Sequence, residues 1–155
     1  MKRLLAALVG LLVAGIGLYL VSARLGWLGN PPGPGEITGP GLPEAVVLAR
    51  QTARSDAAAA AQTASTKHVM FGDFHVHTTY STDAFLWSLP MAGGRGVHPI
   101  GDACDYARYC SGLDFWAITD HAAASTPRRW DETKASVRQC QALAGDPEQP
   151  DLVSF

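Results

Sequence analysis

Two apolar runs in this chain each end in histidine, and this repetition constrains the fold more than any other feature. The first run, residues 69–77, carries His75 and His77, and the second, residues 113–121, ends in His121. Side chains two residues apart in a strand point to the same side. His75 and His77 can therefore present their imidazoles to one point in space. A neighbouring strand that delivers His121 beside them would complete a metal-binding cluster.

The elements that follow residue 67 predict an α/β fold. Strands are expected at residues 69–77, 113–121 and 151–155, with helices at 102–110 and from Thr126 and Pro127 to Gly145 between them. This order implies parallel pairing with right-handed crossovers. The second strand is apolar enough for a sheet that is covered on both faces. Active sites in such domains gather at the carboxyl ends of the strands, so we expect the three histidines to meet there.

Asp83 is the fourth candidate ligand. It follows His77 by six residues, in the long connection after the first strand, and its carboxylate can fold back toward the imidazoles. A mixed set of imidazole and carboxylate donors suits Zn, Mn or Fe, and a bridging carboxylate favours more than one ion. The alternative is that these histidines are ordinary hydrogen-bonded loop residues.

Four further polar residues are weaker candidates. Asp73 shares the face of His75 and is expected to support a ligand, with a solvated side chain as the alternative. Asp120 points to the other face of its strand, where it either orients a ligand or caps the following turn. His98 and Arg95, in the glycine-rich connection, are possible substrate contacts or simply exposed loop residues.

The N-terminal part predicts a membrane segment. Lys2 and Arg3 precede twenty residues without a charge, Leu4 to Ala23, which as a helix would be about 30 Å long. An uncleaved anchor is favoured over a signal peptide cut after Ala23, and in both cases the rest of the chain is exported. The predicted organisation is an anchor over 1–24, a tether and helix over 25–66, and a globular part over 67–155. The tether is rich in Pro and Gly and expected to be poorly ordered to about residue 43, before an Ala-rich helix.

Charge and cysteine content narrow the function classes. The net charge of −2 comes with scattered basic residues and no basic patch, so nothing indicates nucleic-acid binding. Cys104, Cys110 and Cys140 do not have the spacing of a C-x-x-C zinc site. The predicted helix over 102–110 places Cys110 on an apolar stripe with Ala103, Tyr106 and Ala107. A disulfide between Cys110 and Cys140 is the most plausible pairing in an exported protein, and buried free thiols are an equal alternative.

Four segments resemble a known family: FGDFHVHTTYSTD (71–83), DACDYARYC (102–110), LDFWAITDH (113–121) and TPRRWDETK (126–134). They are similar to the DUF3604 branch of the PHP (polymerase and histidinol phosphatase) superfamily, over about residues 68–155. The resemblance implies a distorted (β/α)7 barrel, of which this chain supplies the first two and a half βα units. It also implies two or three divalent metal ions that activate water to cleave phosphate esters, with His75, His77, Asp83 and His121 as ligands. The superfamily's later Glu, His and Asp-x-His ligands have no counterpart in these residues. We therefore expect a fragment that binds metal weakly and is inactive alone.

Together these features predict a single-pass membrane protein whose exported globular part is a metal-dependent hydrolase acting on a phosphoester or another small molecule. Two alternatives stay open: a non-catalytic PHP-like metal-binding module, and an amidohydrolase-type hydrolase. The sequence gives no indication of the particular substrate or of the oligomeric state.

Overall fold

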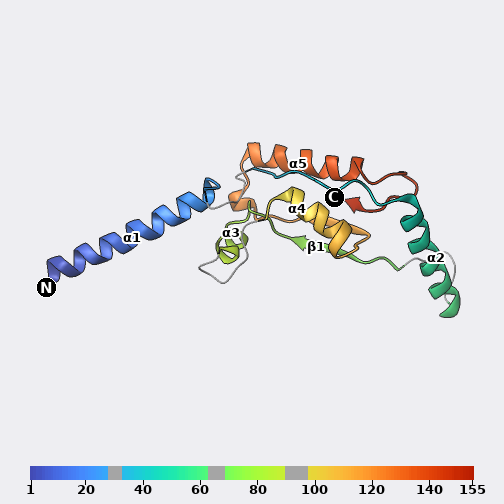
Figure 1. The fold of residues 1–155 in the computed structure, drawn as a ribbon, viewed down its shortest axis with the longest axis horizontal. Coiled ribbons are helices and arrows are strands. Elements are labelled where there is room, and N and C mark those ends of the chain that lie inside the picture. Colours follow the sequence, from blue (N-terminus) through green and yellow to red (C-terminus); the bar gives the residue numbers. More distant parts are fainter. Residues whose placement is uncertain (28–32, 63–68, 90–97) are drawn as a thin grey trace.

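The computed structural model describes residues 1–27, 33–62, 69–89 and 98–155 (Figure 1). Three short strands form a parallel sheet in the order β1 (Gly72–Val76), β2 (Phe115–Ile118) and β3 (Val153–Ser154). The mixed α/β architecture and the parallel pairing confirm the prediction. Each strand is shorter than its apolar run, so His77 and His121 follow the strands rather than end them.

The helices are α1 (Lys2–Arg24), α2 (Glu44–Ala60), α3 (Thr82–Ser88), α4 (Ile100–Asp105) and α5 (Pro127–Ala142), with a π-helical turn η2 (Tyr106–Cys110) and a 3-10 turn η3 (Ala122–Ala124). The start of α5 is as predicted, because the Thr126 hydroxyl accepts the backbone N–H of Arg129 at 3.3 Å and Pro127 takes the first helical position. Gly145 follows the helix at a φ of 81°, the left-handed conformation that glycine adopts most readily.

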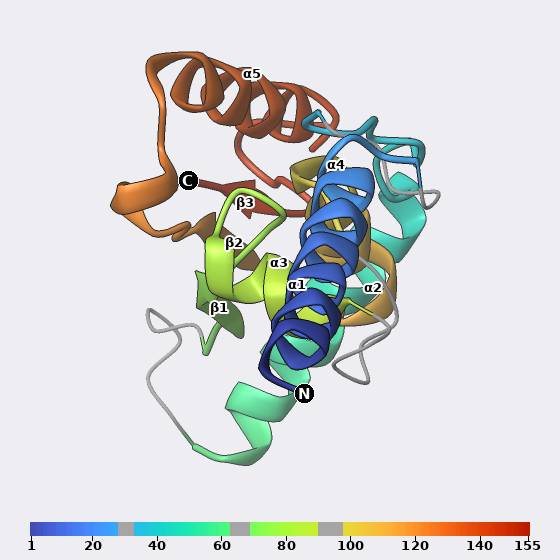
Figure 2. The ribbon, with the colours of Figure 1, turned by 90° about the vertical axis from the view of Figure 1, so that its left-hand side faces the viewer.

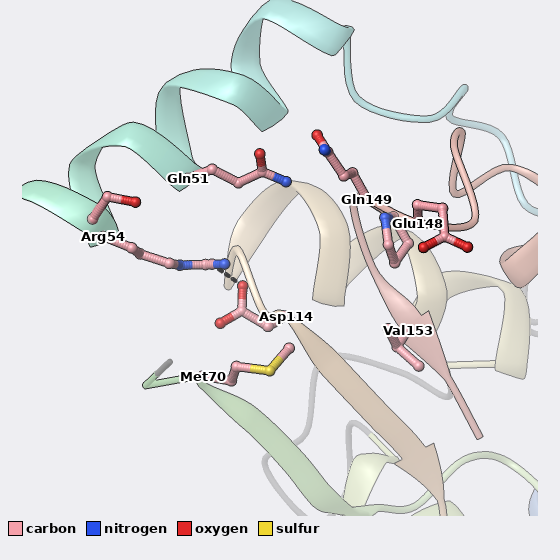
Figure 3. A pocket seen from close by; sticks show the side chains of 9 residues that line it. Gln51, Arg54, Met70, Asp114, Glu148, Gln149 and Val153 are labelled. Carbon is pink, nitrogen blue, oxygen red and sulfur yellow. Dashed lines mark hydrogen bonds and ion pairs between the residues drawn. The ribbon is translucent and has the colours of Figure 1, made fainter. Parts of the chain in front are cut away.

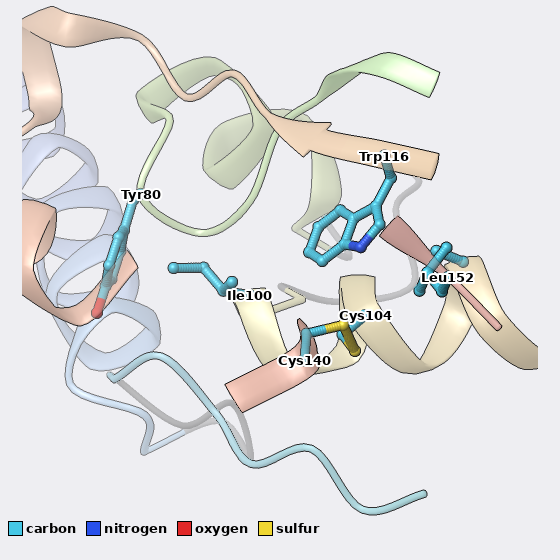
Figure 4. Close-up of a cluster of buried hydrophobic side chains, with 7 residues drawn as sticks. Tyr80, Ile100, Cys104, Trp116, Cys140 and Leu152 are labelled. Atoms are coloured by element: carbon cyan, nitrogen blue, oxygen red, sulfur yellow. A yellow bond between two sulfur atoms is a disulfide. The ribbon is translucent and has the colours of Figure 1, made fainter. Parts of the chain in front are cut away.

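One face of the sheet packs on α4, η2 and α5, and the core lies between these layers (Figure 4). Its buried residues are Tyr80, Ile100, Cys104, Ala107, Trp116, Cys140 and Leu152. On the other face the rings of Phe74, Phe115 and Phe155 are in contact, and Phe74 and Phe155 remain exposed. Among the described residues the helices therefore cover one face of β2, whereas the sequence predicted coverage of both.

The inward face of the helix over 102–110 differs from the predicted stripe. Cys104, Ala107 and Arg108 are buried, whereas Tyr106 and Cys110 are exposed. The reason is the Arg108 guanidinium, whose Nε lies 2.8 Å from Oδ2 of Asp151 in a pair that solvent barely reaches. Because Arg108 points inward, Cys104, which lies one turn earlier on the same side of the helix, points inward with it.

This difference in the inward face of the helix also determines which cysteine forms the disulfide. Cys104 of α4 is bonded to Cys140 of α5, and Cys110 is a free, exposed thiol. The predicted pairing of Cys110 with Cys140 is therefore wrong in one partner. The bond joins the two helices that cover the sheet, within the core.

Replacing Cys104 with Ser is expected to lower the free energy of unfolding by about 4 kcal/mol, since the bond closes a loop of 36 residues in the unfolded chain. Urea unfolding of the oxidised protein measures the change. The matched control is Cys110→Ser, which removes an exposed thiol and should leave the midpoint unchanged. Equal midpoints for Cys104→Ser and the parent would contradict the pairing.

The tether is partly ordered, which corrects the prediction for residues 33–43. Two carboxylates accept its backbone N–H groups: Asp105 bonds Thr38 at 2.9 Å, and Asp151 bonds Leu42 at 2.6 Å. Ile37 packs against the core. A segment without secondary structure has no backbone ladder to satisfy its N–H groups, and these acidic side chains accept two of them. Residues 28–32 lie outside the described part.

Helix α1 is long and apolar enough to cross a membrane, a property that a signal sequence shares. The expected separation between α1 and the α/β part does not hold, because the last turns of α1 pack against α3 (Figures 1 and 2). The residues that share this small core are Tyr19, Leu20, Ala23, Phe85 and Leu89.

Candidate metal centre

The predicted histidines converge at the carboxyl end of the sheet, the end toward which the β1 arrow points in Figure 1. The ring centroids of His75 and His77 are 4.7 Å apart, and those of His77 and His121 are also 4.7 Å apart. Nε2 of His75 lies 3.1 Å from Nε2 of His77. Nε2 of His121 lies 3.1 Å from Oδ2 of Asp83, so the carboxylate has folded back toward the imidazoles.

Three of these residues form a donor set for a single ion. One donor atom each from His77, Asp83 and His121 lies within 4.8 Å of the others. Two imidazole nitrogens and a carboxylate oxygen in such a span are the mixed donors that Zn, Mn and Fe accept. The residues present therefore fit a divalent cation. His75 adjoins this group through His77 and lies outside the set of three.

Asp83 has the charge that a ligand needs. The backbone N–H of Ala84 donates to its carboxylate, and the His121 side chain adds a second hydrogen bond, so the pKa of Asp83 lies below its ordinary value. The side chains of His121 and Asp83 are 59% and 48% exposed. Asp83 is thus ionised at neutral pH and accessible from solvent.

Ser81 is a residue that the sequence analysis missed. Its side chain is fully buried, and its Oγ lies 2.9 Å from Nδ1 of His77 and accepts the backbone N–H of His121 at 2.9 Å. When Nδ1–H of His77 donates to Ser81, Nε2 keeps its lone pair for an ion. Ser81 precedes α3 in the capping position but makes no side-chain cap bond. Its position, four residues after His77 and two before Asp83, is the signal that could have identified it.

Replacing Ser81 with Ala is expected to weaken zinc binding by about 10–100-fold, the usual cost of losing a group that orients a ligating histidine. Competition with a chromophoric chelator measures the affinity. Ser88→Ala is the matched control, because the Ser88 hydroxyl donates to the Phe85 carbonyl elsewhere in the same helix. An unchanged zinc affinity in Ser81→Ala would show that Ser81 does not orient His77.

The carboxylates of Asp120 and Asp73 both accept backbone N–H groups. The Asp120 carboxylate accepts the N–H and the hydroxyl of Thr78, each at 2.6 Å, and so joins the residue after His77 to the end of β2. It therefore caps the turn after β1, not the turn after its own strand. Asp73 is exposed and accepts the backbone N–H of His75 at 2.7 Å. Both residues fix the path of the chain that carries the histidines.

The two possible substrate contacts are not part of the cluster as described. His98 is exposed and its Nδ1 lies 3.2 Å from Oδ2 of Asp102, one helical turn away. Its carbonyl accepts the N–H of Thr79 at 3.0 Å, so His98 lies beside the residues that follow His77. Arg95 lies outside the described residues.

A cavity of about 400 Å³ opens at the opposite end of the sheet, beside the amino ends of the strands (Figure 3). An ion pair between Arg54 of α2 and Asp114 lies in it, and Asp114 also accepts the N–H of Phe71 at 2.8 Å. Its lining contains no histidine or cysteine among the described residues. At this cavity α2 is joined by the Arg54–Asp114 ion pair to the residue before β2, and the histidine cluster lies at the other end of the sheet.

Comparison with known proteins gives one match. A family model described as "Protein of unknown function (DUF3604)" matches residues 64–144, just over half of the chain. The matched part contains all four predicted metal ligands. No curated protein and no solved structure matches the chain.

Proposed function

We propose that this chain is the metal-binding part of a membrane-tethered hydrolase that cleaves phosphoesters. The chain belongs to the DUF3604 family of proteins of unknown function. The observation that carries the proposal is the convergence of His77, Asp83 and His121, which come from three separate segments and bring their donor atoms within 4.8 Å.

The similarity of the four sequence motifs to the PHP superfamily supports the same reading. It implies that β1, β2 and β3 are the first strands of a distorted (β/α)7 barrel. It also implies two or three divalent ions, of which His77, Asp83 and His121 would hold one, and His75 would contribute to another. The parallel strand order agrees with this expectation.

A divalent ion in this position supplies a Lewis acid and lowers the pKa of a bound water. The chain's own residues prepare the site for it. The hydrogen bond from Ala84 keeps Asp83 ionised, and Ser81 fixes the ring of His77. Asp120, through Thr78, holds the chain that leaves β1 against the end of β2. The exposed edges of His121 and Asp83 leave the substrate's phosphate an approach from solvent.

The membrane tether and the exported location are parts of the proposal. The length and composition of α1 support an anchor. Lys2 and Arg3 favour a cytoplasmic N-terminus and hence an exported globular part. The Cys104–Cys140 disulfide agrees with this location, because such bonds persist in oxidising compartments.

Hydrolysis of bis(p-nitrophenyl) phosphate by the full-length protein tests the function. Turnover should require Mn or Zn, disappear with EDTA and return when metal is restored. His75→Ala and Asp83→Ala should each lower kcat/KM by more than about 100-fold, because each removes a metal ligand. Asp131→Ala, which removes an exposed carboxylate from α5, is the control and should leave turnover unchanged.

Turnover that survives EDTA or His75→Ala would overturn the proposal. Tight metal binding without turnover would instead favour the non-catalytic metal-binding module.

A further inference from the structure

An open cavity of about 810 Å³ lies between α1 and α3, directly beside the metal cluster. Its apolar walls come from both helices: Ile16, Leu20, Leu86, Trp87 and Leu89. Asp83 and His121 of the cluster also line it. The cavity therefore joins an apolar compartment to the proposed reaction site, and its volume is in the range of small-molecule sites.

We propose that this cavity binds the acyl chain of a membrane lipid whose phosphate-bearing head group lies at the cluster. The inference rests on the proposed hydrolase function and names its substrate class, a lipid phosphoester.

Specific contacts hold the cavity's two walls together. The Arg24 guanidinium, at the end of α1, donates to the carbonyl of Thr79 at 2.9 Å, two residues after His77. The same guanidinium lies over the ring of Phe85, 5.0 Å from its centroid. Ala23 and Leu89 are buried in the small core between the helices. The exported end of α1 is therefore attached to the segment that carries His77 and Asp83.

The position of this attachment places the cavity at the membrane surface. Ile16 precedes Arg24 by two turns of helix, a rise of about 12 Å. With Arg24 at the surface of a hydrocarbon core about 30 Å thick, the α1 wall of the cavity lies in the outer half of the bilayer. The α3 wall suits this place, since Leu86 and Trp87 are 42% and 75% exposed. Trp27, just beyond α1, is also exposed, and tryptophan is enriched at membrane interfaces.

A lipid phosphoester matches both ends of the cavity. Its chain reaches the apolar walls laterally from the bilayer, while the ester phosphate meets the imidazoles of the cluster, which would hold the ion. In the reaction, a water oxygen bonds to phosphorus, the bond from phosphorus to the leaving oxygen breaks, and the proton of water passes to the leaving alcohol. A fully polar phosphoester would leave the apolar walls without a partner.

The test compares two soluble phosphodiesters with the same reporter, octyl p-nitrophenyl phosphate and ethyl p-nitrophenyl phosphate, as substrates of the full-length protein. Each buried methylene raises affinity roughly fourfold, so burial of even two of the six extra methylenes gives an octyl-to-ethyl ratio of kcat/KM above about tenfold. Leu86→Asp places a charge in the path of the chain and should return the ratio to near one. Leu48→Asp is the matched control on α2, at 45% exposure, and should keep the ratio.

A binding measurement accompanies the kinetic one. In a Trp27→Phe background, which removes the tryptophan beyond α1, vesicles of phosphatidylcholine and phosphatidic acid with brominated acyl chains should quench tryptophan emission of the metal-free protein, and Trp87→Phe should remove most of that quenching.

Ethyl and octyl esters cleaved at equal rates would overturn the lipid inference and leave the hydrolase intact. If neither ester is cleaved, the proposed hydrolase function is overturned. In that case the quenching decides the cavity: quenching that depends on Trp87 supports lipid binding there, and its absence overturns it.

Discussion

Replacing Arg108 with Met is expected to lower the free energy of unfolding by about 3–5 kcal/mol, the usual cost of leaving one charge of a buried ion pair without its partner. The Arg108 side chain is 0% exposed, and its Nε lies 2.8 Å from Oδ2 of Asp151. Its Nη2 donates to the Cys140 carbonyl at 3.0 Å. The guanidinium thus joins η2, α5 and the segment before β3. Its loss leaves the Asp151 carboxylate buried without a cation, and among the described residues the N–H of Leu42 is the donor that remains to it.

Urea unfolding monitored by circular dichroism measures the effect. Arg138→Met removes an exposed cation from α5 and should change the unfolding free energy by less than about 0.5 kcal/mol. The double variant Arg108→Met, Asp151→Leu should recover part of the loss, because it removes the unpaired charge. A cost for Arg108→Met no larger than that for Arg138→Met would show that the pair does not support the core.

Replacing His77 with Ala is expected to weaken zinc binding by more than about 100-fold, beyond the range typical for a residue that only orients a ligand. His77 is central to the cluster, since its ring lies beside both His75 and His121. Chelator competition on the oxidised, metal-free chain measures the affinity. His98→Ala, which removes an exposed histidine paired with Asp102, is the matched control and should leave the affinity unchanged. Equal losses in the two variants would mean that zinc binds histidines indiscriminately.

The sequence predicted the part of the site that depends on strand geometry. The two-residue spacing of His75 and His77, and the parallel strand that precedes His121, were enough to predict that the imidazoles meet. The approach of the Asp83 carboxylate to the imidazoles was also predicted, and its Oδ2 lies 3.1 Å from Nε2 of His121. Ser81 was not found, because a serine before a helix normally caps it, and here its hydroxyl bonds the histidines instead.

The features that the sequence did not predict depend on charged groups inside the fold. A hydropathy pattern assigns arginine to the surface, so the stripe over residues 102–110 was placed on the wrong side of Arg108 and the disulfide was given the wrong cysteine. The tether was expected to be poorly ordered because a segment so dense in Pro and Gly was not expected to bury apolar surface. Its order comes from N–H groups that bond Asp105 and Asp151, which are distant in sequence. The packing of α1 on α3 likewise needs Arg24 and Thr79, 55 residues apart.

The most direct test of the metal centre is the X-ray absorption spectrum of the chain loaded with one equivalent of zinc. The predicted result is a shell of nitrogen and oxygen donors at about 2.0–2.1 Å with the multiple scattering of two or more imidazoles, reduced by His77→Ala. A shell of sulfur at about 2.3 Å would mean that the free thiol of Cys110 holds the zinc, and a shell of oxygen donors without imidazole scattering would mean that the cluster holds none. Either of these two results would contradict a metal centre at His77, Asp83 and His121.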